Sequence, residues 1–282
     1  MPAEIEQELA VDFELVDDPS DADGVVVTPA VRVDAAYLDA AGAQLRIVAN
    51  YAVGLDNVDL DAARERRIVV SNTPGVLTNA TAEHAIGITL ALLRRIGEGD
   101  RALRRRDNWE WGPDFMVGEG LEGKDLLVVG PGRIGRRVAE LALAHGARPT
   151  FAGRDDDLLD VLPGADVVTL HCPLTPETRH LIDVAALAAM KPTAVLVNTA
   201  RGLVVDEAAL VEALQTGAIA GAALDVFEHE PAVTEELLSM ENVVLTPHIA
   251  SATRETRHAM GMLVVSALRA VLLEGRTPPN AV

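Results

Sequence analysis

Leu126-Leu-Val-Val-Gly-Pro-Gly-Arg-Ile-Gly135 decides the fold, because it joins a short apolar run to a patterned set of glycines. The apolar run is typical of a strand buried on both faces, and a helical pattern follows as far as Ala144. Gly130, Gly132 and Gly135 form Gly-x-Gly-x-x-Gly between the two. Such glycines permit a tight turn and a close approach of backbone to a pyrophosphate at the helix N-terminus. The stretch therefore predicts a dinucleotide-binding turn, and a purely structural glycine-rich turn is the alternative.

Strand and helix patterns alternate along most of the chain, which predicts an α/β fold with parallel sheets. Residues 101–122 are the exception, with consecutive arginines, several glycines and both tryptophans, Trp109 and Trp111. We expect this segment to be an irregular connecting arm that packs locally or meets another subunit. Strands are expected at 24–27, 45–49, 68–71, 126–129, 150–152, 166–170, 194–197, 220–226 and 243–245, and helices at 1–10, 34–41, 59–66, 80–95, 133–144 and 206–217.

Composition narrows the class of protein. The 282 residues are 49% hydrophobic with a formal net charge of −19, which argues against a nucleic-acid partner. No apolar run is long enough to span a bilayer, and the single cysteine, Cys172, fits a reducing cytoplasm. Lys124 and Lys191 are the only lysines. An acidic, lysine-poor chain suggests a cytosol of very high salt, with arginine-biased codon usage as the alternative.

Three residues able to do chemistry follow apolar runs in the last third of the chain: Arg201, Glu230 and His248. The segment from Asp206 to Gly217 has an acidic start, helical apolar spacing and a terminal glycine, so it reads as a capped helix. A strand–helix–strand unit places its two strands parallel, which brings Arg201 and Glu230 to the same sheet edge. Ligands bind at that carboxyl edge in open parallel sheets, although each residue alone could be an ordinary surface group.

The residue that selects the nicotinamide cofactor is expected at the end of the second strand, about 20 residues after the first glycine. Here that position holds Gly153 and Arg154 instead of a carboxylate. An arginine can pair with the 2′-phosphate of NADP(H), so NADP(H) is favoured over NAD(H). The acidic run 155–157 follows directly, and it either begins a helix pointing away or repels the phosphate.

Taken together, these motifs make the chain resemble the D-isomer-specific 2-hydroxyacid dehydrogenase family from about residue 24 to its end. Within that family, the stretches 48–54, 153–154 and 251–253 look most like glyoxylate and hydroxypyruvate reductases. The motifs that carry the resemblance are Ala-Val-Gly-Leu-Asp-Asn-Val-Asp (52–59), Asn-Thr-Pro-Gly-Val-Leu-Thr (72–78), Gly-Pro-Gly-Arg-Ile-Gly (130–135), Pro-Leu-Thr (173–175), Asn-Thr-Ala-Arg-Gly (198–202), Leu-Asp-Val-Phe-Glu-His-Glu-Pro (224–231) and Thr-Pro-His-Ile (246–249).

The resemblance implies two Rossmann-like domains with parallel sheets. A substrate domain would comprise residues 1–71 and 253–282, and a dinucleotide-binding domain residues 72–252. It also implies a homodimer, in which Trp111 of the arm reaches the partner's site. The activity implied is NAD(P)H-dependent reduction of a small 2-keto acid to the D-2-hydroxy acid.

Site roles follow from the same resemblance and from side-chain chemistry. His248 would be the general acid, since an unperturbed histidine titrates near pH 6.5, and the Glu230 carboxylate would favour its imidazolium form. Arg201 would bind the substrate carboxylate and polarise the ketone, helped by the backbone at Ala52, Val53 and Gly54. The expected cofactor contacts are Gly130, Gly132, Arg133, Ile134, Gly135, Gly153, Arg154, Cys172, Pro173, Thr199, Ala200 and Asp225. The other histidines, His84 and His180 among them, are expected to be structural or solvated, and no metal site is expected.

Two departures from the family pattern keep a second hypothesis open. Met1 stands within the first expected helix, where a buried strand normally comes first, so the chain could be a truncated reading. The stretch after Arg154 has room for one short helix only, without the usual further helix and edge strand. A degraded relative that binds dinucleotide as a sensor or scaffold is therefore the alternative to an enzyme.

Overall fold

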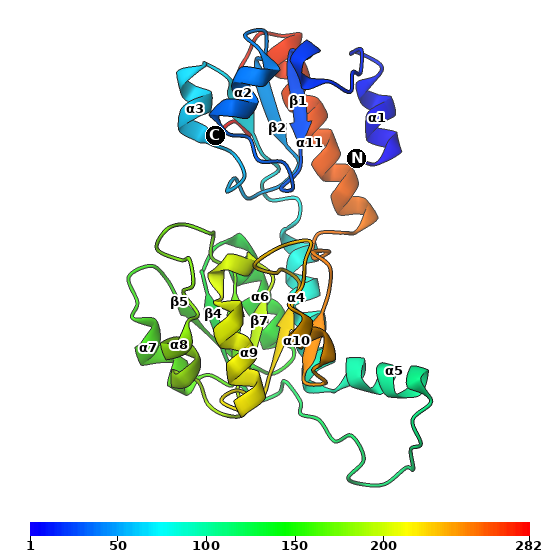
Figure 1. The fold of residues 1–282 in the computed structure, drawn as a ribbon, viewed down its shortest axis with the longest axis vertical. Coiled ribbons are helices and arrows are strands. Elements are labelled where there is room, and N and C mark those ends of the chain that lie inside the picture. The colour runs from blue at the N-terminus through cyan, green and yellow to red at the C-terminus, as the bar shows by residue number, and fades with distance from the viewer. The chain divides into compact units, whose positions relative to one another are not determined.

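The computed structural model describes all 282 residues and confirms an α/β fold with two parallel sheets (Figure 1). The chain divides into two compact units. The first comprises Met1–Leu77 with Ser251–Val282, and the second Thr78–Ala250. Each has its own sheet and its own apolar core.

The first unit is built on a three-stranded sheet in the order β1-β2-β3. Its strands are β1 (Gly24–Val27), β2 (Ile47–Asn50) and β3 (Val69–Ser71), and its helices are α1 (Ala3–Leu9), α2 (Ala35–Ala41), α3 (Leu60–Glu65) and α11 (Arg254–Leu272), with a short 3-10 turn, η1 (Pro19–Asp21). Asp34 and Asp59 cap α2 and α3 by accepting backbone N–H bonds. Helix α11, from the far end of the chain, contacts all three strands and α1, so both chain ends build one core.

The start of the first unit matters because its sheet was expected to lack an interior strand. The sheet has no gap, since β1 pairs directly with β2, with Gly24 opposite Ile47 and Val27 opposite Asn50. Residues 10–18 form no strand, and β1 is an edge strand. The outer edge of β1 has no strand partner, and the outer edge of β3 has only the isolated bridge of Ser71 with Ala281.

The second unit carries six parallel strands in the order β5-β4-β6-β7-β8-β9. The strands are β4 (Asp125–Val129), β5 (Arg148–Ala152), β6 (Val167–Leu170), β7 (Val195–Asn198), β8 (Gly221–Leu224) and β9 (Val243–Leu245). The helices are α4 (Thr78–Leu93), α5 (Ile96–Arg105), α6 (Arg133–Ala144), α7 (Leu158–Val161), α8 (Val184–Ala189), α9 (Glu207–Thr216) and α10 (Glu235–Ser239), with 3-10 turns η2 (Leu162–Gly164) and η3 (Gly202–Val204).

Both faces of this sheet are covered at its centre, which explains why β4, β6, β7 and β8 are mostly apolar and buried, whereas the edge strand β5 is largely exposed. Leu126 and Val128 of β4 face the core shared with α4 and α6, whereas Leu127 and Val129 face the core shared with α8 and α9. The last residues of three strands are aligned, with Asn198 opposite Leu224 and Leu224 opposite Leu245. The loops after β7, β8 and β9 therefore start side by side at the carboxyl edge.

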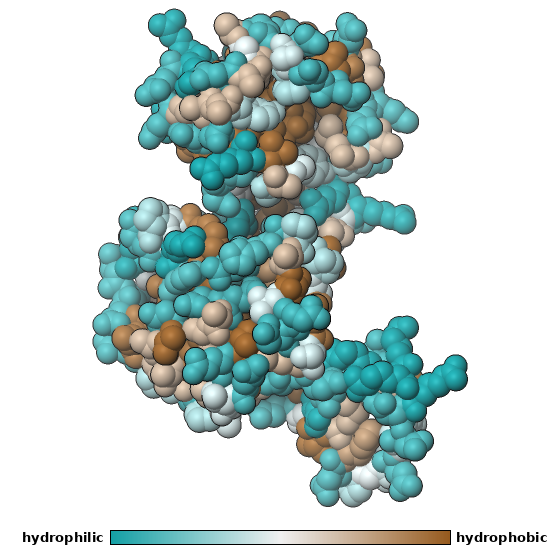
Figure 2. Space-filling model, in the orientation of Figure 1, coloured by the Kyte–Doolittle hydropathy of each residue, from teal (hydrophilic) through white to brown (hydrophobic).

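The expectation of an irregular arm over residues 101–122 is wrong at its start, because α5 continues to Arg105. Ion pairs stabilise this exposed helix: Arg104 bonds Asp100 one turn earlier, and Arg101 bonds Glu241. Beyond the helix the chain is irregular, and Trp109 stacks on Phe115 with ring centroids 5.9 Å apart. Trp111 is 84% exposed. Apolar side chains gather on this arm in Figure 2.

Substituting Ile5 by alanine tests whether α1 is a packed part of the first core. Ile5 is fully buried, and Gly261 of α11 approaches it so closely that a Cβ there would lie 2.4 Å from its Cγ1. We expect Ile5→Ala to reduce the free energy of unfolding by about 2–5 kcal/mol, measured by denaturant unfolding. Val11→Ala, at a residue 73% exposed, is the control. Equal stability of the two variants would show that α1 does not pack there.

Candidate active site

The loop after β7 carries Arg201. Asn198, the last residue of β7, accepts the Ala200 N–H at 3.0 Å and donates to the Arg201 carbonyl at 2.8 Å, which fixes the turn. Gly202 follows, and a Cβ there would lie 1.9 Å from the carbonyl carbon of Phe227. Only glycine lets this loop lie against the loop after β8, so the backbone of Arg201 is held beside the segment that carries Glu230.

The loop after β8 places Glu230 toward the loop after β9. One carboxylate oxygen of Glu230 accepts the Phe227 N–H at 3.0 Å. The other pairs with Nδ1 of His248 at 2.7 Å. Both side chains are about one third exposed, so the pair is accessible to solvent and to a ligand.

Glu230 is held in its ionised form. Partial burial raises the pKa of Glu230, but the hydrogen bonds from His248 and Phe227 and the positive charge of Arg201 outweigh that effect and lower it overall. A carboxylate facing Nδ1 leaves Nε2 of His248 as the ring nitrogen available to a ligand. The arrangement can therefore donate or accept a proton at Nε2, and the charge of Arg201 acts on the carboxylate that pairs with the ring.

His248 has a left-handed backbone, with φ of 52°. This conformation is unfavourable for a residue with a side chain and persists only where neighbours enforce it. Asp225, fully buried, provides that constraint: its main-chain carbonyl accepts the His248 N–H at 2.8 Å, and its carboxylate accepts Ile249 and Ala250 N–H at 2.9 and 2.8 Å. The loop that carries the histidine is thus wrapped around one carboxylate.

The glycine-rich turn after β4 fits a dinucleotide. Gly130 has φ of 94°, and a Cβ there would lie 2.6 Å from the backbone nitrogen of Cys172. Gly135 meets the Gly130 carbonyl in the same way, at 2.3 Å, whereas a Cβ on Gly132 would meet nothing within 4 Å. Gly132 therefore leaves open space at the N-terminus of α6, where the Arg133, Ile134 and Gly135 N–H groups have no intrahelical partner.

The segment after β5 decides how the acidic run 155–157 is used. Asp157 caps α7 by accepting the Leu159 N–H at 3.0 Å. Asp156 turns back and accepts the Gly153 N–H at 2.7 Å. Arg154 is exposed between them. One carboxylate therefore begins a helix, as one of the two expectations had it, while another lies close to the glycine-rich turn.

Further expected cofactor residues lie at the same sheet edge. The Thr199 hydroxyl, just after β7, is buried without a hydrogen-bond partner. Cys172 and Pro173 follow β6, and the Cys172 backbone packs against Gly130. An unsatisfied buried hydroxyl at the same sheet edge as the glycine-rich turn is the kind of group that a bound ligand satisfies.

Ala52, Val53 and Gly54 lie in the first unit, directly after β2. Their carbonyls accept hydrogen bonds from within the same unit. The donors are the Thr73 N–H to Ala52, the Asn72 side-chain amide to Val53 and the Asn50 side-chain amide to Gly54. Their own three N–H groups donate no hydrogen bond. This segment therefore offers backbone donors to an anion.

Two histidines expected to be structural or solvated contact site loops. Nε2 of His84, on α4, lies 3.0 Å from the Thr246 hydroxyl and 3.3 Å from the Asp225 carboxylate. His180, after β6, pairs with Glu228 at 2.8 Å. Both contacts join segments far apart in the chain, and no local motif in the sequence signals them.

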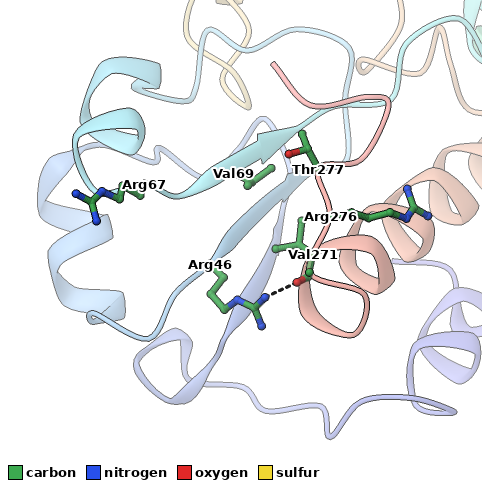
Figure 3. A pocket seen from close by; sticks show the side chains of 7 residues that line it. Arg46, Arg67, Val69, Val271, Arg276 and Thr277 are labelled. Atoms are coloured by element: carbon green, nitrogen blue, oxygen red, sulfur yellow. Dashed lines mark hydrogen bonds between the residues drawn. The ribbon is translucent and has the colours of Figure 1, made fainter.

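A separate pocket of about 220 Å³ lies on the first unit, among Arg46, Arg67 and Arg276 (Figure 3). Its three guanidinium groups point in different directions, and that of Arg46 bonds the carbonyls of Val271 and Leu272 at the end of α11. These arginines therefore do not converge on one ligand. No group of three or more potential metal-binding side chains occurs. None of the helices is both long and apolar enough to cross a membrane.

Comparison with known proteins agrees with this geometry. Residues 86–250 match the model of the D-isomer specific 2-hydroxyacid dehydrogenase NAD-binding domain. The glyoxylate reductase of Pyrococcus furiosus is 45% identical over 95% of this chain and 84% of its own, and that of Aeropyrum pernix is 46% identical over 93% and 83%. The structure of an NADPH-dependent glyoxylate/hydroxypyruvate reductase from Sinorhizobium meliloti, in complex with NADP and malonate, is 36% identical with a TM-score of 0.88, covering 100% of this chain and 94% of its own.

The fold and the glycine-rich turn define a dinucleotide-binding α/β protein of the doubly wound class. With these matches, the chain belongs to the D-isomer specific 2-hydroxyacid dehydrogenase family of enzymes.

The environment of Cys172 predicts an unreactive thiol. Burial raises the pKa of Cys172 to about 11, so the nucleophilic thiolate is scarce at neutral pH. We expect slow alkylation by iodoacetamide at pH 8 and a rate that rises about tenfold per pH unit up to pH 10. Free cysteine under the same conditions is the control, and a rate that levels off by pH 9 would contradict the assignment.

Proposed function

We propose that this enzyme reduces a small 2-keto acid of the glyoxylate or hydroxypyruvate type to the D-2-hydroxy acid, with His248 as proton donor. The observation that carries the proposal is the 2.7 Å pair of His248 and Glu230 at the carboxyl edge of a dinucleotide-binding sheet. The relatives named glyoxylate reductase support the substrate class, since they align with nearly the whole chain.

Each group of the site has a distinct role in this proposal. Arg201 forms a charged, forked hydrogen bond with the substrate carboxylate and polarises the ketone, as a planar guanidinium can. The unpaired N–H groups of residues 52–54 are proposed as donors to a substrate carboxylate. His248 gives a proton from Nε2 to the ketone oxygen, while Glu230 stabilises the imidazolium and orients the ring. A bound nicotinamide supplies the hydride for the carbonyl carbon.

The two units divide this work. The second unit holds the dinucleotide through the glycine-rich turn, Arg133, Ile134, Gly153, Arg154, Cys172, Pro173, Thr199, Ala200 and Asp225. The first unit contributes the substrate loop at 52–54. Arg201, Glu230 and His248 are all present in one unit and the last two are paired, which favours an enzyme over the alternative of a non-catalytic sensor.

NADP(H) is the proposed cofactor. The exposed Arg154 stands where an acidic residue selects NAD, and the related Sinorhizobium enzyme is NADPH-dependent and holds NADP. Within the acidic run 155–157, the carboxylate of Asp156 accepts the Gly153 N–H next to Arg154. A carboxylate there repels a phosphate and so weakens the preference for NADP(H) over NAD(H).

We propose that the protein assembles as a homodimer and that the arm, the irregular segment after α5, contacts the partner subunit. The arm exposes Trp109, Trp111, Phe115 and Val117, large apolar groups of the kind that anchor protein interfaces. We also propose a cytoplasmic location and stability that depends on high salt, as the charge of −19 suggests.

Replacing His248 by asparagine tests the proton donor. Asparagine cannot donate a proton as an acid, so we expect kcat for glyoxylate reduction, followed by NADPH absorbance at 340 nm, to fall by about 10² to 10⁴. His258→Asn is the matched control, because His258 pairs with exposed Glu4 on the first unit. The role is refuted if His248→Asn is folded and keeps more than a tenth of the activity.

Replacing Arg154 by alanine tests the cofactor preference. Losing a charged hydrogen bond costs about 1.5–3 kcal/mol, so kcat/KM for NADPH should fall about 10- to 100-fold while that for NADH changes little. Arg148→Ala is the control, since Arg148 starts the same strand and pairs with Asp125 at its far end. A wild-type enzyme that clearly prefers NADH would contradict the proposal, whatever the variant does.

A further inference from the structure

His84 contacts the centre of the site from a helix that carries no other site residue. It lies on α4, and its side chain is 19% exposed. Nε2 is 3.0 Å from the Thr246 hydroxyl oxygen and 3.3 Å from Oδ1 of Asp225. A single ring nitrogen therefore faces both the hydroxyl and the carboxylate.

The directions of these hydrogen bonds can be worked out from the available protons. Thr246 Oγ1 donates its only proton to Asp225 at 2.6 Å. The same oxygen can then only accept from His84, so Nε2 carries a proton and acts as the donor. His84 thereby fixes the hydroxyl rotor of Thr246 and directs positive potential toward Asp225.

The Asp225 carboxylate depends on such donors because it is fully buried. Burial raises its pKa, and the hydrogen bonds from His84, Thr246, Ile249 and Ala250 outweigh this and lower it. Apart from Thr246, the donors are two backbone N–H groups of the loop that carries His248. His84 is the one side chain that reaches this carboxylate from outside the loop and can carry a positive charge.

We propose that His84 is a positioning residue for His248: through Thr246 and Asp225 it holds loop 246–250 in the conformation that aims the catalytic imidazole. The proposal deepens the proposed function, since it concerns the same proton donor. His248 has a left-handed backbone, so the loop relaxes when its anchor weakens. A displacement of about 1 Å in a catalytic group can cost about 10²-fold in rate.

The kinetic test compares His84→Ala, His84→Gln and Glu83→Ala. Glu83 is the neighbouring exposed residue on α4, so its variant controls for changes to the helix. We expect His84→Ala to lower kcat about 10- to 100-fold, with the NADPH dissociation constant, measured by fluorescence, changed less than threefold. Glutamine keeps an N–H donor and should restore most of kcat. The proposal would be overturned if His84→Ala lost kcat only in proportion to the loss of folded protein. It would also be overturned if His84→Gln lost as much kcat as His84→Ala.

A second measurement does not depend on activity. The Nδ1–H proton of His248, bonded to Glu230, should give a downfield NMR signal in the protein without substrate. We expect this signal to broaden or shift in His84→Ala and in Thr246→Val, which keeps the side-chain volume, and to persist in Glu83→Ala and His84→Gln. An unchanged signal in both His84→Ala and Thr246→Val overturns the positioning role. A wild-type protein that reduces no 2-keto acid would refute the proposed function while this readout still tests the positioning.

Discussion

The buried carboxylate of Asp225 is the interaction on which the site depends. It directly follows β8 and holds the loop after β9 by accepting hydrogen bonds from Thr246, Ile249 and Ala250. Its main-chain carbonyl holds His248 in a left-handed conformation that the chain would not adopt alone. A charge so fully removed from water is stable only while every donor stays in place, so the loop has one low-energy arrangement. Catalytic geometry is thus specified by a group that does not itself react.

Close packing of backbone against backbone fixes the neighbouring loops. Gly202 lets the arginine loop lie against Phe227, and Gly130 lets the glycine-rich turn lie against Cys172, at distances that leave no room for a side chain. Because β4 pairs with β6 and β7 pairs with β8 in register, these contacts join loops from neighbouring strands. Arg201, Glu230 and His248 therefore occupy one sheet edge, as ligand sites of parallel sheets do.

Much of the fold could be predicted from the sequence, because strands buried on both faces leave apolar runs and capped helices leave Asp and Gly at their ends. The helix over residues 207–216, capped by Asp206 and ended by Gly217, is an example. Helix α5 was missed because ion pairs with Asp100 and Glu241 stabilise it, rather than an apolar face. The site motifs could be found as strand ends, but the contacts of His84 and His180 could not. They join residues 162 and 48 positions apart, and only the folded chain brings them together.

The central claim is that Glu230 stabilises the protonated form of the imidazole that delivers the proton. The most direct measurement is the pH dependence of kcat/KM for glyoxylate reduction in the wild type and in Glu230→Gln. Reduction requires the imidazolium, and glutamine keeps the size of the side chain without its charge. The account predicts that kcat/KM falls by about 10²-fold or more in the variant across this pH range, because the imidazole loses its charged partner. A folded variant that keeps the kcat/KM of the wild type at every pH would contradict it.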